Sequence, residues 1–325
     1  MKTIHIIKNR SDLGAGTRGA DMGIDAIEIA AINKNDDYFN CYPFEDVETE
    51  NETIYNKVNF TSAKRIENVL RVCERLSLSV EKNLKDNNFP IVLSGDHSSA
   101  IGTISGIKAA FPDKRLGVVW IDAHADIHSP YTSPSGNIHG MPLAAVLGDD
   151  NLDFKIKDVM DDAYLYWEEL KDIGIKGAKI KHEDVVYFGV RDTEQPEEDT
   201  IAKNKMKNYT VSEMRYRGMA TCLVEAVTKL NKCDLIYISF DVDSMDCDLI
   251  SKGTGTPVSK GFDHLEIIEI IKAFIDTDKV VSFEVVEVNP LMDNKGNVMA
   301  ETAFEVLKVT TEAVEVKSQK LKVKS

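Results

Sequence analysis

The sequence contains little cysteine and proline, no long apolar run and fewer basic than acidic side chains, and each shortage excludes a class of protein. Its five cysteines are odd in number, widely spaced and without a CxxC pair, which favours a reduced cytoplasm over a disulfide framework. With no apolar run of 18 residues, we expect neither a signal peptide nor a membrane span. The formal charge of −15 disfavours nucleic acid and anionic membranes as partners, because both require a cationic surface.

No linker and no internal repeat divides the 325 residues, and the 9 prolines and 19 glycines are scattered. Apolar residues recur at three- and four-residue spacing in six segments, which predicts helices over residues 62–82, 98–110, 158–170, 221–231, 263–275 and 299–316. Short apolar runs alternate with these segments, beginning with the first eight residues. The alternation predicts a single-domain α/β fold with a mainly parallel central sheet and right-handed crossovers.

The most informative segment follows the apolar run 116–121 and reads Asp122-Ala-His124-Ala-Asp126. Side chains alternate along a strand, so these three residues share a face wherever the extended geometry persists. Run 91–94 similarly leads into Gly-Asp-His97, and run 235–240 into Asp241-Val-Asp243. In a parallel sheet the three strand ends lie at one edge, where such folds bind ligands. The sequence therefore predicts the convergence of six residues: His97, Asp122, His124, Asp126, Asp241 and Asp243.

Any one of these motifs alone is more often a turn whose aspartates cap helices or loop amides. Together, four aspartates and two histidines would repel one another without a cation, whereas two divalent ions match four carboxylates in charge. Oxygen-rich ligation with two imidazoles and no clustered thiolate favours manganese over structural zinc. Two such ions about 3.5–4 Å apart turn a bound water into hydroxide near neutral pH, which predicts a hydrolase.

These residues, together with Ser135-Gly-Asn-Ile-His139-Gly-Met-Pro142, Gly253-Thr-Gly-Thr256-Pro257 and Glu287-Val-Asn-Pro290, resemble the ureohydrolases, and most closely arginase. The Ser-Gly-Asn-x-His-Gly segment is similar to arginase rather than to agmatinase or formimidoylglutamase. The resemblance extends over most of the chain, from Gly14 to Pro290. It implies an arginase-like three-layer α/β/α fold and hydrolysis of L-arginine to L-ornithine and urea by a metal-bridging hydroxide.

The resemblance also implies a role for each matching residue. One manganese ion would be held by His97, Asp122, Asp126 and Asp241. The other would be held by Asp122, His124, Asp241 and Asp243, so that Asp122 and Asp241 bridge the two ions. The catalytic roles implied are proton shuttling by His139, proton acceptance by Asp126 and guanidinium binding by Glu287. The remaining substrate-pocket residues implied are Ser135 and Asn137 at the amino-acid end, Asp192 near the metals, and Thr256.

Two departures from the family pattern lie where arginase holds the α-carboxylate and α-ammonium groups of its substrate. His128 replaces an expected asparagine, and Glu194 replaces an expected aspartate. Glu194 keeps the charge that suits an ammonium and His128 can still donate to a carboxylate, so L-arginine remains the favoured substrate. The alternatives are a hydrolase of the agmatinase, guanidinobutyrase or formimidoylglutamase type and a catalytically silent metal-binding scaffold.

Several residues have an ordinary structural interpretation beside the functional one. Without the resemblance, His139 would be a solvated loop histidine. Glu287 ends an apolar strand, where an acid is costly unless it is paired, and a guanidinium would pair it; Glu284 in the same strand is expected to make structural hydrogen bonds. Cys247 receives no role. The basic tail, residues 317–325, is either a frayed terminus or a contact arm of the homo-oligomer, a trimer or hexamer, that the resemblance implies.

Overall fold

One parallel sheet forms the centre of the molecule. The computed structural model describes residues 3–159 and 162–324, and its eight strands lie in the order β2-β1-β3-β8-β7-β4-β5-β6. Every neighbouring pair is parallel. The strands are β1 (Thr3–Asn9), β2 (Phe44–Asp46), β3 (Asn88–Ser94), β4 (Leu116–Ile121), β5 (Val185–Phe188), β6 (Lys207–Tyr209), β7 (Leu235–Asp241) and β8 (Val280–Val286).

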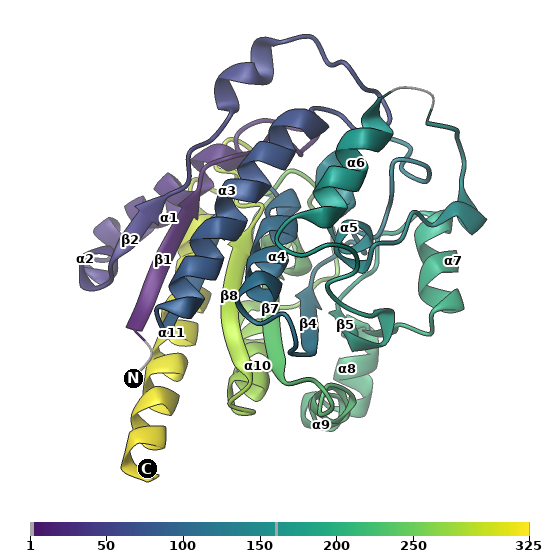
Figure 1. The fold of residues 1–325 in the computed structure, drawn as a ribbon. Coiled ribbons are helices and arrows are strands. Elements are labelled where there is room, and N and C mark those ends of the chain that lie inside the picture. The colour runs from purple at the N-terminus through teal and green to yellow at the C-terminus, as the bar shows by residue number, and fades with distance from the viewer. Residues whose placement is uncertain (1–2, 160–161, 325) are drawn as a thin grey trace.

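Helices cover both faces of the sheet and make three layers (Figure 1). One face packs against α3 (Ile66–Lys85), α4 (Ala100–Ala110), α5 (Pro142–Leu147) and α6 (Ala163–Asp172). The other packs against α1 (Gly23–Asn33), α8 (Val211–Arg217), α9 (Met219–Lys229), α10 (His264–Ile275) and α11 (Val298–Lys324). The remaining helices are α2 (Tyr38–Cys41) and α7 (Gln195–Lys203). Among the described residues, no helix combines the length and apolarity that a membrane span requires.

Strand β4 illustrates why the sheet is buried on both faces. All six of its residues are buried, and successive side chains enter opposite layers, with Val118 and Trp120 in one core and Val119 and Ile121 in the other. A continuous apolar run is typical of a parallel strand that is covered on both sides. Consequently charged side chains of the central strands concentrate at the strand ends, and a mid-strand exception such as Glu284 must be hydrogen-bonded.

Close packing of α3 on α4 depends on a glycine. A Cβ atom at Gly102 of α4 would lie 2.7 Å from the carbonyl oxygen of Cys73 in α3, closer than real Cβ contacts. The glycine therefore lets the backbones approach, and this fixes the start of α4 directly behind the turn that carries His97.

The predicted fold class is confirmed: the sheet is entirely parallel and the helices form two outer layers. All six predicted helices are present with shifted ends, and residues 160–161 of one prediction lie outside the described residues. Helix α11 continues beyond residue 316 into the segment that we interpreted as a tail. The elements without a predicted counterpart are α1, α2, α5, α7, α8, β2, β5 and β6, most of which are short.

Candidate active site

Four neighbouring strands carry the predicted site residues at their carboxyl ends. The order β3-β8-β7-β4 places the turn with His97, the residue Glu287, the pair Asp241 and Asp243, and the segment 122–126 along one edge. Backbone contacts tighten this edge, because the amide of Glu287 donates to the carbonyl of Gly95 at 2.8 Å. The structure thus brings together all six residues that the sequence predicted to converge.

The ring of His97 is surrounded by carboxylates on one edge. Its Nδ1 atom lies 3.0 Å from Asp122 Oδ2, 3.1 Å from Asp126 Oδ2 and 3.2 Å from Asp241 Oδ2. None of these contacts has the geometry of a hydrogen bond, and Nδ1 has no such partner among the described residues. A buried nitrogen facing three carboxylate oxygens in this way fits a shared cation.

Two further side chains fix the orientation of the His97 ring. Its other nitrogen, Nε2, pairs with Ser239 Oγ at 2.7 Å, and the ring stacks on Trp120 with centroids 4.0 Å apart and planes 3° from parallel. A hydrogen bond to the second ring nitrogen determines which nitrogen faces a metal and in which tautomer. Ser239 and Trp120 lie on β7 and β4, so the sheet itself holds the imidazole.

The second histidine faces an overlapping set of carboxylates. His124 Nδ1 lies 3.0 Å from Asp243 Oδ2 and 3.5 Å from Asp122 Oδ1. The two oxygens of Asp122 therefore face different histidines, as a bridging carboxylate requires. In both bridging candidates Oδ1 also accepts from a backbone amide two residues on, Asp122 from His124 at 2.7 Å and Asp241 from Asp243 at 2.8 Å. Thr256 Oγ1 donates to Asp243 Oδ2 at 3.0 Å and so borders this half of the site.

Burial makes this concentration of charge costly. Burial and the charges of Asp243 and Asp122 raise the pKa of Asp241 well above its usual value. Burial and the neighbouring Asp122 likewise raise the pKa of Asp126 to about 7. Burial alone lowers the pKa of His97, but the surrounding carboxylates hold it well above its usual value. Divalent cations would relieve the repulsion among the carboxylates, so these residues fit a binuclear metal site.

Glu287 and His139 form an ion pair beside the metal-ligand cluster. Glu287 is 2% exposed, and its Oε1 accepts from His139 Nδ1 and from the amide of His97, both at 3.0 Å. Burial lowers the pKa of His139, but the charge and hydrogen bond of Glu287, together with the charges of Asp126 and Asp96, outweigh burial and raise the pKa to about 9. Glu287 has a φ of 67° and Asp126 a φ of 48°, backbone conformations that are uncommon outside glycine and concentrate at functional sites.

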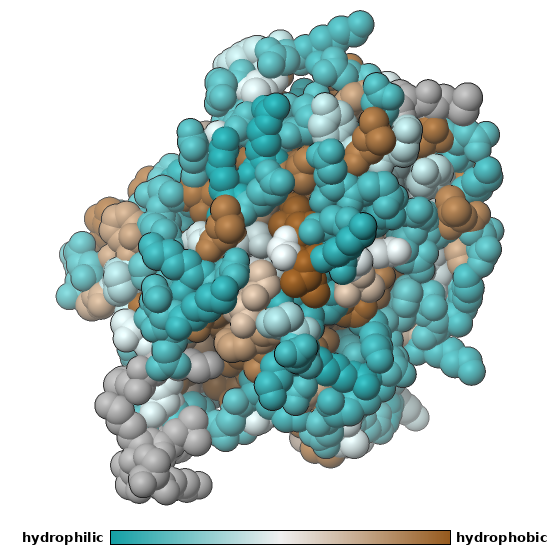
Figure 2. All heavy atoms as spheres, viewed as in Figure 1, coloured by the Kyte–Doolittle hydropathy of each residue, from teal (hydrophilic) through white to brown (hydrophobic). Residues whose placement is uncertain are grey.

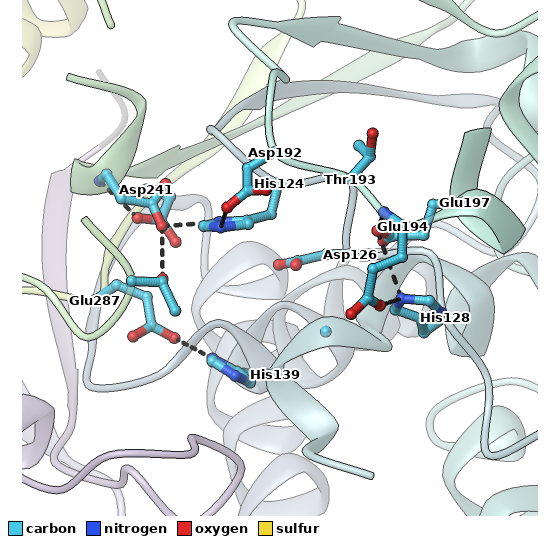
Figure 3. A pocket seen from close by; sticks show the side chains of 13 residues that line it. His124, Asp126, His128, His139, Asp192, Thr193, Glu194, Glu197, Asp241 and Glu287 are labelled. Carbon is cyan, nitrogen blue, oxygen red and sulfur yellow. Dashed lines mark hydrogen bonds and ion pairs between the residues drawn. The ribbon is translucent and has the colours of Figure 1, made fainter. Parts of the chain in front are cut away.

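A cavity of about 240 Å³ opens onto these groups (Figure 3). At one end lie His124, Asp126, His139, Asp192, Asp241, Asp243, Thr256 and Glu287, with Asp192 Oδ2 3.7 Å from His124 Nε2, and at the other lie His128, Thr193, Glu194 and Glu197. Among the residues that the structure describes, neither lysine nor arginine lines it. The predicted substrate residues Ser135 and Asn137 are not among the lining residues. Ser135 is exposed, and the side chain of Asn137 accepts a hydrogen bond from Lys64 at 3.2 Å.

Comparison with known proteins identifies the family. The family model described as "Arginase family" matches residues 2–312. The chain belongs to the arginase family. It is 36% identical to the arginase of Bacillus subtilis over 308 residues, which cover 94% of this chain and 96% of that protein. The arginase of Bacillus caldovelox is 35% identical over 91% of this chain and 93% of its own length.

Solved arginase structures share the fold. The native structure of the Bacillus caldovelox arginase superposes with a TM-score of 0.80 at 34% identity, over 95% of this chain and 98% of that one. The Entamoeba histolytica arginase in complex with L-ornithine gives a TM-score of 0.80 at 26% identity, over 97% and 99%. Arginase-family proteins are metal-dependent hydrolases, so the predicted class of enzyme is confirmed.

Within this arginase-family site, three side chains escaped the sequence-based reasoning: Trp120, Ser239 and Glu197. Trp120 and Ser239 lie in apolar runs that indicate only buried strands. Glu197 stands at the third position of a helix, where an acid usually reaches back to the helix start, and its Oε2 accepts from the amide of Glu194 at 3.1 Å. The sequence Glu194-Gln-Pro-Glu197 carried that signal.

Glu284, which the sequence analysis expected to make structural hydrogen bonds, accepts them from Ser99 Oγ at 2.6 Å and from the Tyr237 hydroxyl at 2.5 Å.

Proposed function

We propose that this protein is an arginase, which hydrolyses L-arginine to L-ornithine and urea. One observation carries the proposal: a carboxylate and imidazole cluster that fits two cations shares a cavity with the buried ion pair of Glu287 and His139. A guanidinium group requires both a strong nucleophile beside its carbon and a carboxylate that holds the planar cation still. The cavity contains candidates for both tasks.

We assign the metal ligands as two overlapping sets. His97, Asp122, Asp126 and Asp241 would hold one manganese ion, and His124, Asp122, Asp241 and Asp243 the other. Two described groups of potential ligands, His97 with Asp122 and Asp126 and Asp122 with His124 and Asp243, support this assignment. When bound, such a pair of cations lowers the pKa of a water molecule toward neutrality and polarises the substrate. The preference for manganese rests on the oxygen-rich ligand set with two imidazoles.

The chain's own residues would orient the guanidinium and move protons. Glu287 would pair with the guanidinium through charge-assisted hydrogen bonds, in competition with His139 for the same carboxylate. Hydrolysis joins a water oxygen to the guanidino carbon and breaks the bond to the ornithine nitrogen, which leaves with a proton. Asp126 would accept a proton from the water, and His139, whose pKa is raised by Glu287, would supply the proton to the leaving nitrogen.

The far end of the cavity would hold the amino-acid end of the substrate. Glu194 and His128 line this end, whereas Thr256 and Asp192, which contacts His124, border the metal-ligand end. Ser135 and Asn137 would bind the α-carboxylate from the loop beside it. The arginase of Entamoeba histolytica was solved with L-ornithine, the amino-acid product of the proposed reaction.

We further propose that the chain folds as one domain, residues 1–325, and acts in the cytoplasm as a homo-oligomer, a trimer or hexamer. The charge of −15 and the absence of paired cysteines support a cytoplasmic enzyme whose partners are neither nucleic acid nor membrane. The tail segment, residues 317–325, is the candidate oligomer contact.

A second candidate, agmatine hydrolysis, is favoured by one observation. The far end of the cavity contains the carboxylates of Glu194 and Glu197 and, among the described residues, no lysine or arginine, which suits the ammonium group of agmatine as well as that of arginine. The decisive experiment measures urea release by the manganese-loaded protein from arginine, agmatine and guanidinobutyrate at equal concentrations. We expect the highest kcat/KM with arginine, and a clear preference for agmatine would replace arginase by agmatinase.

A further inference from the structure

The two residues that depart from the arginase pattern contact each other. His128 Nε2 makes an ion pair with Glu194 Oε2, and the same nitrogen lies 3.5 Å from Glu197 Oε2 (Figure 3). The sequence analysis treated the two departures as separate contacts to substrate. Asparagine and aspartate, the residues expected at these positions, are both shorter than the pair that is present.

Both polar atoms of His128 already have protein partners. Nδ1 pairs with Thr132 Oγ1 at 3.2 Å, while Nε2 faces Glu194 and Glu197. An imidazole has only two hydrogen-bonding atoms, and the residue is 6% exposed. No donor of His128 therefore remains for the carboxylate of a substrate.

Glu197 anchors this arrangement from the buried side. It is 6% exposed, and its Oε1 accepts from the amide of Ile127 at 3.4 Å while its Oε2 accepts from the amide of Glu194. One carboxylate thus ties the segment that follows Asp126 to the start of α7. The two walls of the cavity carry His128 and Glu194, so their spacing is fixed by backbone contacts.

Glu194 differs from its two partners in exposure. Its side chain is 53% exposed and lines the cavity, whereas those of His128 and Glu197 are each 7% exposed. A buried imidazole holds this carboxylate at the cavity wall, and no described lysine or arginine lines the cavity, so the carboxylate suits the ammonium end of the substrate.

We propose that His128 is a positioning residue that acts through Glu194, and that the two form a single specificity element for the primary ammonium group of the substrate. This proposal rests on the proposed guanidino hydrolysis at the other end of the cavity. It makes the two departures mutually dependent, because Glu194 reaches its place only when His128 holds it, and His128 loses its main partner without Glu194.

A double-mutant cycle tests this dependence with four metal-loaded proteins: the parent, His128→Asn, Glu194→Asp and the double variant. We expect each single change to raise KM for arginine about fivefold or more, a typical coupling for contacting residues, with kcat within about twofold because the metal ligands and Glu287 are untouched. The double variant should have a KM within about twofold of the worse single variant, because each single change already removes the contact. Effects that multiply in the double variant would refute the pairing.

Two further variants separate positioning from general structural damage. His128→Gln keeps an amide donor close to the position of Nε2, so KM should stay within about threefold of the parent, while His128→Asn cannot reach Glu194. Glu312→Asp makes the same shortening on an exposed residue of α11 that does not line the cavity and should change neither constant. If His128→Gln loses as much as His128→Asn, hydrogen bonding through Nε2 is not the operative contact.

Failure of the coupling between His128 and Glu194 can be distinguished from failure of the proposed arginine hydrolysis. If the parent releases no urea from arginine, the proposed function fails, and the cycle is then measured as midpoints of thermal unfolding, which need no substrate. We expect both single variants to unfold at lower temperature and the double variant to unfold close to the less stable single variant. Additive shifts in the unfolding midpoint would refute the coupling whatever the enzyme hydrolyses.

Discussion

Replacing Glu287 by glutamine removes the charge proposed to hold the guanidinium while keeping the side chain's shape. The parent carboxylate is buried, and its Oε1 accepts two hydrogen bonds of 3.0 Å, from His139 and from the amide of His97. A hydrogen bond to a charged group contributes about 1.5–3 kcal/mol, so loss of one such interaction in the transition state lowers kcat/KM by about 10- to 150-fold. Steady-state urea release measures this change directly.

The refuting result for Glu287→Gln is a kcat/KM equal to that of the parent with two metal ions still bound. Glu284→Gln is the matched control, since the same change is made on the same strand to an equally buried acid that does not line the cavity. We expect Glu284→Gln to lower the unfolding temperature, because Ser99 and Tyr237 lose a charged acceptor, while KM for arginine stays unchanged. Equal loss of activity in both variants would show that removing any buried charge in or next to β8 lowers activity, and Glu287 would then have no specific role in binding the guanidinium.

Three further predictions follow from the metal-ligand cluster and the ion pair. Asp122→Ala should remove activity and bound metal together, as measured by elemental analysis, because its two oxygens face both histidines; full occupancy with normal turnover would contradict the bridge. His97→Ala or His124→Ala should leave about one ion per chain, and unchanged metal content would remove that residue from the ligand set. Because the folded-state pKa of His139 is raised to about 9, its ion pair with Glu287 stabilises the fold fully below the unfolded value of about 6.5 and is lost as the pH rises through about 9. The unfolding temperature of the parent relative to His139→Gln should fall over that interval, and a difference independent of pH would contradict the pairing.

The sequence predicted the convergence of the carboxylates and imidazoles well because its signal is local. Each of these residues follows an apolar run, and the ends of parallel strands meet at one edge of the sheet whichever helices connect them. The same logic located Glu287 at the end of β8. Elements with weak local signals were missed: β6 has only three residues, with the sequence Lys-Asn-Tyr, at the edge of the sheet, and α1 lacks a polar stripe that would mark its period.

The far end of the cavity could not be predicted in the same way. Whether His128 faces substrate or protein depends on side-chain contacts between segments 66 residues apart, and nothing in the local sequence records them. Ser135 and Asn137 show the same limit. Their loop packs its backbone against residue 61 at Gly136, where a Cβ atom would lie 2.0 Å from the Thr61 carbonyl oxygen, and Asn137 bonds to Lys64.

The central claim, hydrolysis of a guanidino group at a binuclear metal site, is tested most directly by adding manganese to the metal-free protein and measuring urea release from arginine. The account predicts that activity rises with added metal and saturates at two equivalents per chain, and that Asp122→Ala neither binds both ions nor gains activity. Two tightly bound equivalents without urea release from arginine, agmatine or guanidinobutyrate would contradict it.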